Sequence, residues 1–341
     1  MQHIKTVPGP ASGPTSGLDT QRIARFALRY SLVIILALFL VTLAVSNRSF
    51  LTVSNVNVIL IQVAANALLA TGATFVILTG GIDLSVGSIV GLAGVAAALF
   101  AQNDGPVPLA ESIAVGVLAG GAIGAFNGVL VALAKVPPFV ATLGNMTVAS
   151  GLAFVFSDGQ PISGLSDQFL SLSGTVGGVS IPVLVMIVVV AISWVVLART
   201  KFGMHIYAVG GNAHAARVAG VSLRRTRFAV YTISGVLAGV AGVLLAARAT
   251  AGIANTGTGY ELNAIAAAVI GGISLMGGRG SLIGTIFGFL IIGVLDNGLN
   301  IINVSPFYQL IVKGLIIIGA VFVDSITHLS LIHISEPTRP Y

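Results

Sequence analysis

Long apolar runs, separated by short polar or glycine-rich breaks, make up most of the chain. The runs are continuous and do not alternate between apolar and polar residues, which favours membrane helices over a membrane β-barrel. A helix crosses the hydrocarbon core with about 20 apolar residues. We therefore predict an all-α polytopic membrane protein with about ten transmembrane helices, over Tyr30–Val45, Val53–Thr79, Val86–Phe100, Ser112–Ala134, Phe139–Phe156, Ile181–Ala198, Phe228–Ala247, Leu262–Met276, Leu282–Leu299 and Pro306–Val323.

Composition supports this class of protein. Hydrophobic residues make up 56% of the chain and charged residues 8%, whereas a soluble domain has about 25% charged residues. The net charge of +6 does not indicate nucleic-acid binding, because the basic residues lie beside the apolar runs, as the positive-inside rule expects. The chain has no cysteine, which excludes disulfides and thiolate metal sites.

The basic residues also predict the orientation in the membrane. If the N-terminus is cytoplasmic and the helices alternate in direction, only Arg48 and Arg248 face outward. The basic residues that then face inward are Lys5, Arg22, Arg25, Arg29, Lys135, Arg199, Lys201, Arg217, Arg224, Arg225, Arg227 and Arg279. This asymmetry predicts that both termini are cytoplasmic. Lys313 falls within the last helix, where a packed or snorkelling lysine is a simpler interpretation than a charge in a transport pathway.

Glycine recurs at intervals of four residues within several runs. Such spacing lets helix backbones approach closely in lipid. It predicts a compact bundle and carries no information about a substrate. The glycines concerned are Gly116, Gly120, Gly124, Gly128, Gly235, Gly239, Gly284 and Gly288.

Sequence motifs for enzyme chemistry are absent. The chain contains no Gly-Lys pair, so it has no nucleotide-binding P-loop. Its five histidines do not form the H-E-x-x-H zinc motif. We therefore predict a membrane passageway without catalytic or metal-binding residues, whose driving energy comes from elsewhere.

The stretch "TGGIDLSVGS" at residues 79–88 interrupts an apolar run. Gly80 and Gly81 are suited to end one helix with a positive φ. Asp83 then starts the next helix by accepting from the amides near Ser85 and Val86. The predicted helices on either side are unequal, with 27 and 15 residues, which suggests a turn set shallowly within the membrane against protein or a water-filled cavity. A purely structural cap and a role for the charge at a gate are both retained.

A second glycine-rich break, "IGGISL" at 270–275, lies on the same predicted side of the membrane. Polar residues inside the apolar runs are further pathway candidates, although interhelical hydrogen bonding explains each of them as well. The gate and pathway candidates are Gly80, Gly81, Asp83, Ser85, Asn66, Asn127, Asn297 and Asn300, with Asn145 and Asn263 as additional asparagines.

The longest predicted cytoplasmic loop is Arg199–Arg227. Its middle, Asn212–Ala219, has small, helix-compatible residues, with Asn212 as a possible N-cap and Gly220 as a possible end. A short helix framed by turns is well suited to enter the groove of a partner protein. An ordinary basic loop near anionic lipid is the alternative.

Four stretches together resemble a known family. They are "TGGIDLSVGS" at 79–88, "VPPFVATLG" at 136–144, "GGNAHAARVAGV" at 210–221, and "AIAAAVIGGISLMGGRGSLIGT" at 264–285 with the "NGLN" and "SPFYQLIVKGL" that follow. The chain resembles the membrane-spanning permease subunits of bacterial ABC importers for monosaccharides, of the ribose-type branch that also includes permeases for autoinducer-type signals. The resemblance extends over residues 50–324.

The resemblance implies a vitamin-B12-permease-like helical architecture in the bacterial inner membrane. It implies a second permease copy or paralogue, two cytoplasmic ATPase subunits that bind the ATP, and an extracytoplasmic sugar-binding protein, with no cofactor in this chain. It also makes Ala213–Ala219 the helix that docks into the ATPase. The residues assigned to this coupling loop are Gly210, Gly211, Asn212, Ala213, Ala215, Ala216, Arg217, Ala219 and Gly220.

Two alternatives to this function stay open. A branched-chain amino-acid permease shares the general architecture, although the IDLSVGS and PFVATLG stretches favour the sugar branch. An ion-coupled secondary transporter requires charged or unwound half-helices near the middle of the membrane. The sequence does not identify the sugar.

The two ends of the chain are assigned separately from the transmembrane domain, residues 23–324. Residues 1–22 begin with a Pro-, Gly- and Ser-rich stretch and are predicted to be a disordered cytoplasmic tail. Tyr30–Val45 follows arginines and has no small-residue cleavage site, so we predict a retained helix rather than a signal peptide. Residues 325–341 include "LSLIHISEPTR", which resembles the in-frame translation of a transposon-end sequencing adapter, and we expect this tail to be an artefact.

Overall fold

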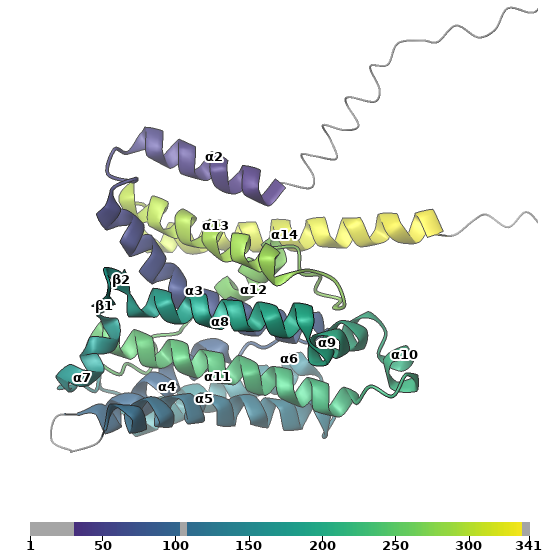
Figure 1. Ribbon diagram of the computed structural model, residues 1–341, viewed down its shortest axis with the longest axis horizontal. Coiled ribbons are helices and arrows are strands. Elements are labelled where there is room, and N and C mark those ends of the chain that lie inside the picture. The colour runs from purple at the N-terminus through teal and green to yellow at the C-terminus, as the bar shows by residue number, and fades with distance from the viewer. Residues whose placement is uncertain (1–30, 103–107, 336–341) are drawn as a thin grey trace, which may run out of the picture.

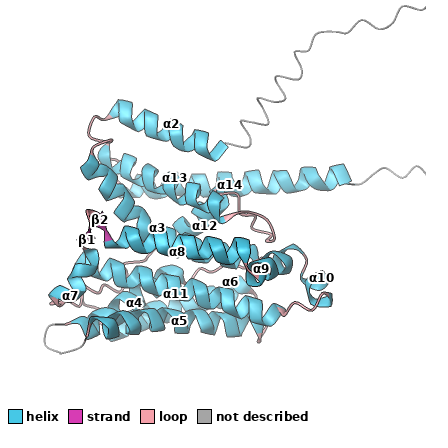
Figure 2. Cartoon of the chain, viewed as in Figure 1, coloured by secondary structure: helices cyan, strands magenta, loops and turns pink. Residues whose placement is uncertain are grey.

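The protein is a bundle of long, roughly antiparallel helices (Figures 1 and 2). The computed structural model describes residues 31–102 and 108–335. The long and medium helices are α2 (Ser31–Ser46), α3 (Val53–Leu78), α4 (Val86–Ala101), α5 (Leu109–Ala132), α6 (Pro138–Phe156), α8 (Ile181–Arg199), α9 (Lys201–Gly211), α11 (Leu223–Ala249), α12 (Tyr260–Ile270), α13 (Leu282–Ile301) and α14 (Pro306–Ser335). The short elements are α7 (Asp167–Leu170), the 3-10 turn η1 (Ser171–Ser173), the antiparallel strands β1 (Thr175–Val176) and β2 (Val179–Ser180), and α10 (Ala213–Val218).

Each of the ten predicted apolar segments overlaps one of these helices. Within the described residues, six helices are long and apolar enough to cross a membrane, namely α3, α5, α6, α8, α11 and α13. The prediction for Leu262–Met276 was wrong at its end, because Gly271 and Gly272 terminate α12 at Ile270, and Gly272 has a φ of 84°. With 11 residues, α12 is about 16 Å long and covers only part of a membrane.

The described helices divide into central and peripheral ones. In α3, 78% of the most apolar stretch of 18 residues is buried inside the protein, and in α11 and α13 the share is 67%. In α6 and α8 the share is only 28%, so most of their apolar side chains face outward. Apolar side chains on the outer faces of a bundle are what lipid requires, and the fold is that of a multi-pass membrane protein.

Glycine brings α5 and α11 into close contact, as the four-residue spacing predicted. A side chain at Gly120 would meet Gly235 and Gly239, and one at Gly124 would meet Gly235. Gly284 and Gly288 of α13 pack in the same way against the last turn of α12. Because the backbones touch at these positions, any larger residue would force the helices apart.

The bundle has two distinct ends (Figure 1). One end carries α9 and α10, and we call it the α10 end. The opposite end carries α7, η1 and the β1–β2 hairpin, and we call it the α7 end. The sequence did not predict α9 as a helix, because its residues were assigned to a loop.

The terminal segments are only partly described. The tail predicted over 1–22 lies outside the described residues. Helix α14 continues to Ser335 and therefore includes part of the 325–341 segment. Whether that segment belongs to the natural protein stays a prediction.

Candidate functional site

The segment predicted as a coupling helix is a short helix with a cap at each end. The side chain of Asn212 accepts from the amide of Ala215 at 2.9 Å and caps the N-terminus of α10. At the other end Gly220 has a φ of 84°, and the Val221 amide donates to the Ala216 carbonyl at 2.9 Å. This is the Schellman arrangement that glycine allows. The predicted capping roles of Asn212 and Gly220 are confirmed.

One face of α10 is held by the bundle and the other is exposed. Ala216 is buried in a small cluster with Val209 and Leu223. Arg217 and Val218 point outward, and 78% of the Val218 side chain is exposed. The exposed face of α10 is thus formed by a basic and an apolar side chain that have no packing role within the bundle.

Three glycine-containing segments meet near the start of α10, and we call their contact the glycine junction. The segments are 78–81, 210–211 and 277–278. The Gly278 amide donates to the Leu78 carbonyl at 2.9 Å. A side chain at Gly210 would collide with both of these backbone groups. The break at 79–81 therefore lies beside Gly277 and Gly278, which follow the "IGGISL" break at 270–275 in the chain.

Helix α9 is tied to the same region by Tyr207, whose hydroxyl donates to the Gly280 carbonyl at 3.1 Å. Burial raises the pKa of the Tyr207 phenol above its ordinary value, so the group stays protonated and remains a donor. The coupling segment and the 271–281 loop are thus joined by backbone and side-chain contacts.

The end of α3 follows the geometry that its glycines predicted. The Gly80 amide donates to Ile77 at 2.8 Å and the Gly81 amide donates to Val76 at 3.2 Å. Gly80 has a φ of 77°, whereas Gly81 does not have a positive φ. The chain then runs irregularly to Ser85 before α4 begins at Val86.

Asp83 accepts three hydrogen bonds and is 2% exposed. Its Oδ1 accepts from the Ser85 amide at 3.0 Å and from the Ser85 hydroxyl at 2.6 Å. Its Oδ2 accepts from the hydroxyl of Ser234 on α11 at 2.9 Å. The contact with the Ser85 amide agrees with the capping prediction. The residue at the N-cap position is nevertheless Ser85, and the bond to α11 makes Asp83 more than a local cap.

The hydrogen bonds continue from Ser85 to two of the predicted asparagines. Asn127 of α5 donates to the Ser85 hydroxyl at 2.8 Å, and Asn145 of α6 donates to Asn127 at 2.6 Å. All five side chains are buried. We call this series, Asn145, Asn127, Ser85, Asp83 and Ser234, the polar chain. It joins α6, α5, the α3–α4 turn and α11. Its member on α5, Asn127, lies about 7 Å along the helix axis from the end of α5.

Two short helices begin beside the polar chain and run in opposite directions. Gly87, in the first turn of α4, lies against the Gly257 carbonyl and the carboxylate of Glu261, in the first turn of α12. The irregular segment before α12 packs along α4, because Ala254 lies against Gly91 and Gly252 against Gly94. Irregular backbone inside a bundle is tolerated where protein covers it or where it lines a cavity.

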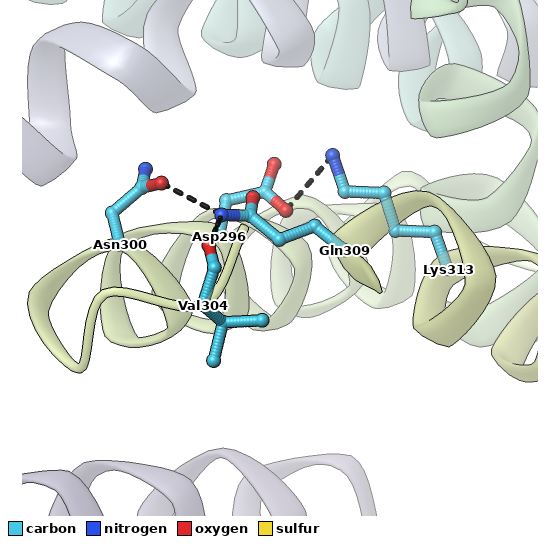
Figure 3. A network of polar contacts seen from close by, with 5 residues as sticks. All are labelled: Asp296, Asn300, Val304, Gln309 and Lys313. Atoms are coloured by element: carbon cyan, nitrogen blue, oxygen red, sulfur yellow. Dashed lines mark hydrogen bonds and ion pairs between the residues drawn. The ribbon is translucent and has the colours of Figure 1, made fainter. Parts of the chain in front are cut away.

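A second group of polar contacts lies toward the α7 end, where α13 meets α14 (Figure 3). Lys313 of α14 forms an ion pair with Asp296 of α13 at 2.9 Å. Gln309 donates to Asn300 at 2.8 Å and to the Val304 carbonyl at 2.9 Å. The structure agrees with the interpretation of Lys313 as a packed lysine, and it supplies the partner that the sequence analysis did not name.

The remaining asparagine candidates are scattered. Asn297 exchanges two hydrogen bonds of 3.0 Å with Asn55 of α3. Asn66 is 7% exposed, and its Oδ1 has no hydrogen-bond partner among the described residues. Asn263 is half-buried on α12. The candidates therefore do not form one site, and only Asp83, Ser85, Asn127 and Asn145 come together.

Sequence reasoning missed Ser234, Glu261 and Asp296. Serine is common in membrane helices, so nothing marked Ser234 in advance. Asp296 and Lys313 are opposite charges in neighbouring apolar runs. Charges within membrane helices usually pair with one another, so the sequence did contain an indication of this ion pair. Over the part of the chain that the structure describes, no three His, Asp or Glu residues gather closely enough to hold a metal ion.

Comparison with known proteins identifies the family. Residues 55–321 match the family described as "Branched-chain amino acid transport system / permease component". The chain is 44% identical to the ribose import permease protein RbsC of Bacillus subtilis, over 85% of this chain and 91% of that protein. It is 40% identical to the D-allose transport system permease protein AlsC of Escherichia coli, over 88% and 91% of the two chains.

A further relative is the L-arabinose ABC transporter permease protein AraH of Azospirillum brasilense, which is 36% identical over 95% of both chains. No solved structure matches the chain. The family resemblance stated from the four sequence motifs is confirmed, and the chain belongs to this family of ABC transporter permeases.

Proposed function

We propose that this chain is the membrane-spanning permease subunit of an ABC importer that brings a monosaccharide, ribose or a close relative of it, into the cell. The observation that carries the proposal is the 44% identity to a ribose import permease over nearly the whole chain. The family description also covers branched-chain amino acids, but the relatives reported above are named for sugars. The chain itself is not an enzyme.

The α10 end is the cytoplasmic end in this proposal. The basic residues Arg199, Arg217 and Arg227 lie at or beside α9 and α10, whereas Arg248 lies at the opposite end of α11. This distribution follows the positive-inside rule. With ten crossings, both termini are cytoplasmic, and the architecture is of the vitamin-B12-permease type.

Helix α10 is the element that the ATPase subunit contacts. Its caps fix its length, and its anchoring through Ala216 leaves Arg217 and Val218 free to enter a groove of the partner. The glycine junction links α10 to the turn that carries Asp83. ATP-driven movement of the ATPase subunits is thereby transmitted to the membrane helices, which requires contacts that differ between two states.

The polar chain and the two short helices are the gate region. The hydrogen bonds of Asn127 to Ser85 and of Ser234 to Asp83 join α5, the α3–α4 turn and α11, three elements that have to move apart for a sugar to pass. Hydroxyl and amide groups are suitable hydrogen-bond partners for a sugar once they exchange their partners within the protein. A second permease copy, or a paralogue, completes the pathway, and an extracytoplasmic binding protein delivers the sugar at the α7 end.

The test of substrate uses the binding protein that belongs to the same importer. Its thermal stability is measured across a panel of monosaccharides and branched-chain amino acids, and uptake of the stabilising ligand is then measured in cells with and without this permease. We expect a pentose or hexose to raise the melting temperature and to enter only with the permease. Stabilisation by leucine or valine alone would establish the amino-acid alternative instead.

The test of the coupling helix uses one exposed valine at each end of the bundle. Val218→Glu on α10 should abolish copurification of the ATPase subunit and uptake, because it places a charge in the proposed apolar contact. Val176→Glu on β1, where the side chain is 60% exposed, should leave copurification unchanged. Full binding of the ATPase to Val218→Glu protein would exclude α10 as the docking element.

A further inference from the structure

The α10 end contains a cavity of about 670 Å³ that borders α10 and the α3–α4 turn. It opens between the end of α5, the start of α6, α10 and the start of α11. Four basic residues line it, namely Lys135, Arg217, Arg224 and Arg227. No acidic residue is among the lining residues.

None of the four basic side chains forms an ion pair with a described residue. Over the residues that the structure describes, the only ion pair is that of Lys313 with Asp296, at the interface of α13 and α14. Arg227 is half-buried despite lacking a carboxylate partner. Like charges gathered around one cavity repel one another, so their arrangement is stabilised when an anion enters.

The remaining groups around the cavity also favour an anion. The first turn of α11 lies in the lining, with Ser222 at its N-cap and Leu223 as its first residue. The N-terminus of a long helix carries unpaired amides and a partial positive charge. Ser222 supplies a hydroxyl group that can donate to a phosphate oxygen, whereas the Thr79 hydroxyl already donates to the Val76 carbonyl at 2.8 Å.

The inner part of the lining connects the cavity to the gate region. Gly80, Gly81 and Tyr231 form part of it. The Tyr231 hydroxyl donates to the Ile82 carbonyl at 3.4 Å, next to Asp83 in the chain. An anion in the cavity would therefore touch α10, the α5–α6 connection, α11 and the α3–α4 turn together.

We propose that this cavity is a binding site for a phosphate group, and that an occupied site holds the coupling helix and the gate region in one relative position. The volume is far larger than a single phosphate needs, so the group belongs to a larger molecule, either the headgroup of an anionic lipid or a soluble phosphate ester. Basic pockets between membrane helices on the cytoplasmic side are suited to both. The guanidinium groups supply the paired donors that phosphate prefers.

The test uses the permease together with its ATPase subunit, because an acidic side chain of the ATPase would compete for the same basic residues. The complex is placed in nanodiscs of phosphatidylcholine, and its unfolding temperature is followed as inorganic phosphate replaces chloride at constant ionic strength. We expect a saturable rise, since a ligand that binds only the folded state stabilises it by mass action. The absence of any rise in the complex would overturn the proposal.

A second set of nanodiscs contains phosphatidylglycerol and identifies the source of the phosphate group. If the lipid headgroup fills the cavity, these nanodiscs stabilise the complex and inorganic phosphate adds nothing further. If the natural ligand is soluble, inorganic phosphate stabilises the complex equally in both lipids. Either result supports the site, and each names a different ligand.

Arg227→Gln is compared with a matched control, Arg225→Gln. Arg225 lies in the same turn of α11, is exposed and is not among the lining residues. Loss of one charged contact should weaken phosphate binding roughly tenfold in Arg227→Gln protein, whereas Arg225→Gln protein should bind as the unaltered chain does. Lys135→Gln provides a second variant if Arg227→Gln protein does not fold.

Equal weakening by Arg225→Gln would show general attraction to a basic surface and would overturn the proposal. The measurement does not depend on the transported sugar. Phosphate binding without sugar uptake would contradict the proposed function only, and uptake without phosphate binding would contradict this inference only.

Discussion

The protein buries two aspartates among apolar helices and satisfies them in different ways. Asp83, in the polar chain, receives three hydrogen bonds from an amide and two hydroxyls and has no basic partner. Asp296 is paired with Lys313 across the interface of α13 and α14. Both residues are at most 4% exposed, so burial does not distinguish them.

The difference lies in what each arrangement can do when helices move. An ion pair in a low-dielectric environment is costly to separate, because each charge is left without compensation. Hydroxyl and amide groups exchange partners at a smaller cost. The ion pair is therefore suited to an interface that stays closed, and the polar chain to one that opens.

Breaking the ion pair from one side should have the largest effect. Lys313→Met leaves Asp296 buried without its partner and should destabilise the protein by roughly 3–5 kcal/mol. Thermal unfolding in detergent measures this loss. The double variant Asp296→Leu with Lys313→Met removes both charges and should recover most of it. A double variant no more stable than Lys313→Met alone would contradict the idea that the unpaired charge is the cause.

Asp83→Ala should come next in effect. It removes the acceptor of three donors, of which the two serine hydroxyls can rotate toward other acceptors. The Ser85 amide is left unsatisfied at a cost of about 1–3 kcal/mol, so we expect poor expression and loss of uptake. Asp83→Asn keeps Oδ1 for Ser85 and should be nearly normal if hydrogen bonding is the whole role. Normal expression of Asp83→Asn protein without uptake would show that the charge itself is needed.

Ser234→Ala should have a smaller effect, limited to the link between the α3–α4 turn and α11. Loss of this one buried hydrogen bond should cost about 1 kcal/mol and should weaken coupling between ATP hydrolysis and uptake. Thr232→Ala is the matched control, because Thr232 is on the same helix and its hydroxyl donates only to the Phe228 carbonyl. Equal uptake by the two variants would remove Ser234 from the gate region.

Gln309→Ala should have the smallest effect of the four. It removes the contacts with Asn300 and the Val304 carbonyl but leaves the ion pair of Asp296 and Lys313 intact. The expected loss of stability is about 0.5–1.5 kcal/mol, with uptake unchanged, which thermal unfolding and a sugar uptake assay measure together. Impaired uptake at normal expression would mean that this interface also moves during transport.

The apolar pattern predicted the helices well because period and length are local properties of a sequence. The caps of α10 followed from Asn212 and Gly220, whose preferences are equally local. The end of α12 was predicted too late, because the run from 262 to 276 stays apolar beyond Gly271. In that case the backbone freedom of glycine outweighed hydropathy.

The partners of the candidate residues were not predictable from the sequence. Asp83 and Ser234 are 151 residues apart, and only the packing of the α3–α4 turn on α11 brings them together. The same holds for Asn145 and Asn127, which were considered as separate positions on separate helices. Single polar residues in apolar runs show where a site can lie, but tertiary packing decides which of them share it.

At the glycine junction, three stretches of chain touch backbone to backbone. Side chains between two helices usually absorb a small displacement by changing rotamer, and no side chain separates Gly210 from the Leu78 carbonyl and the Gly278 amide. The last turn of α9 therefore contacts the end of α3 directly through backbone atoms. The connection between α10, the proposed docking helix, and the turn that carries Asp83 therefore consists of backbone contacts. It is stiff because no flexible side chain lies between the two.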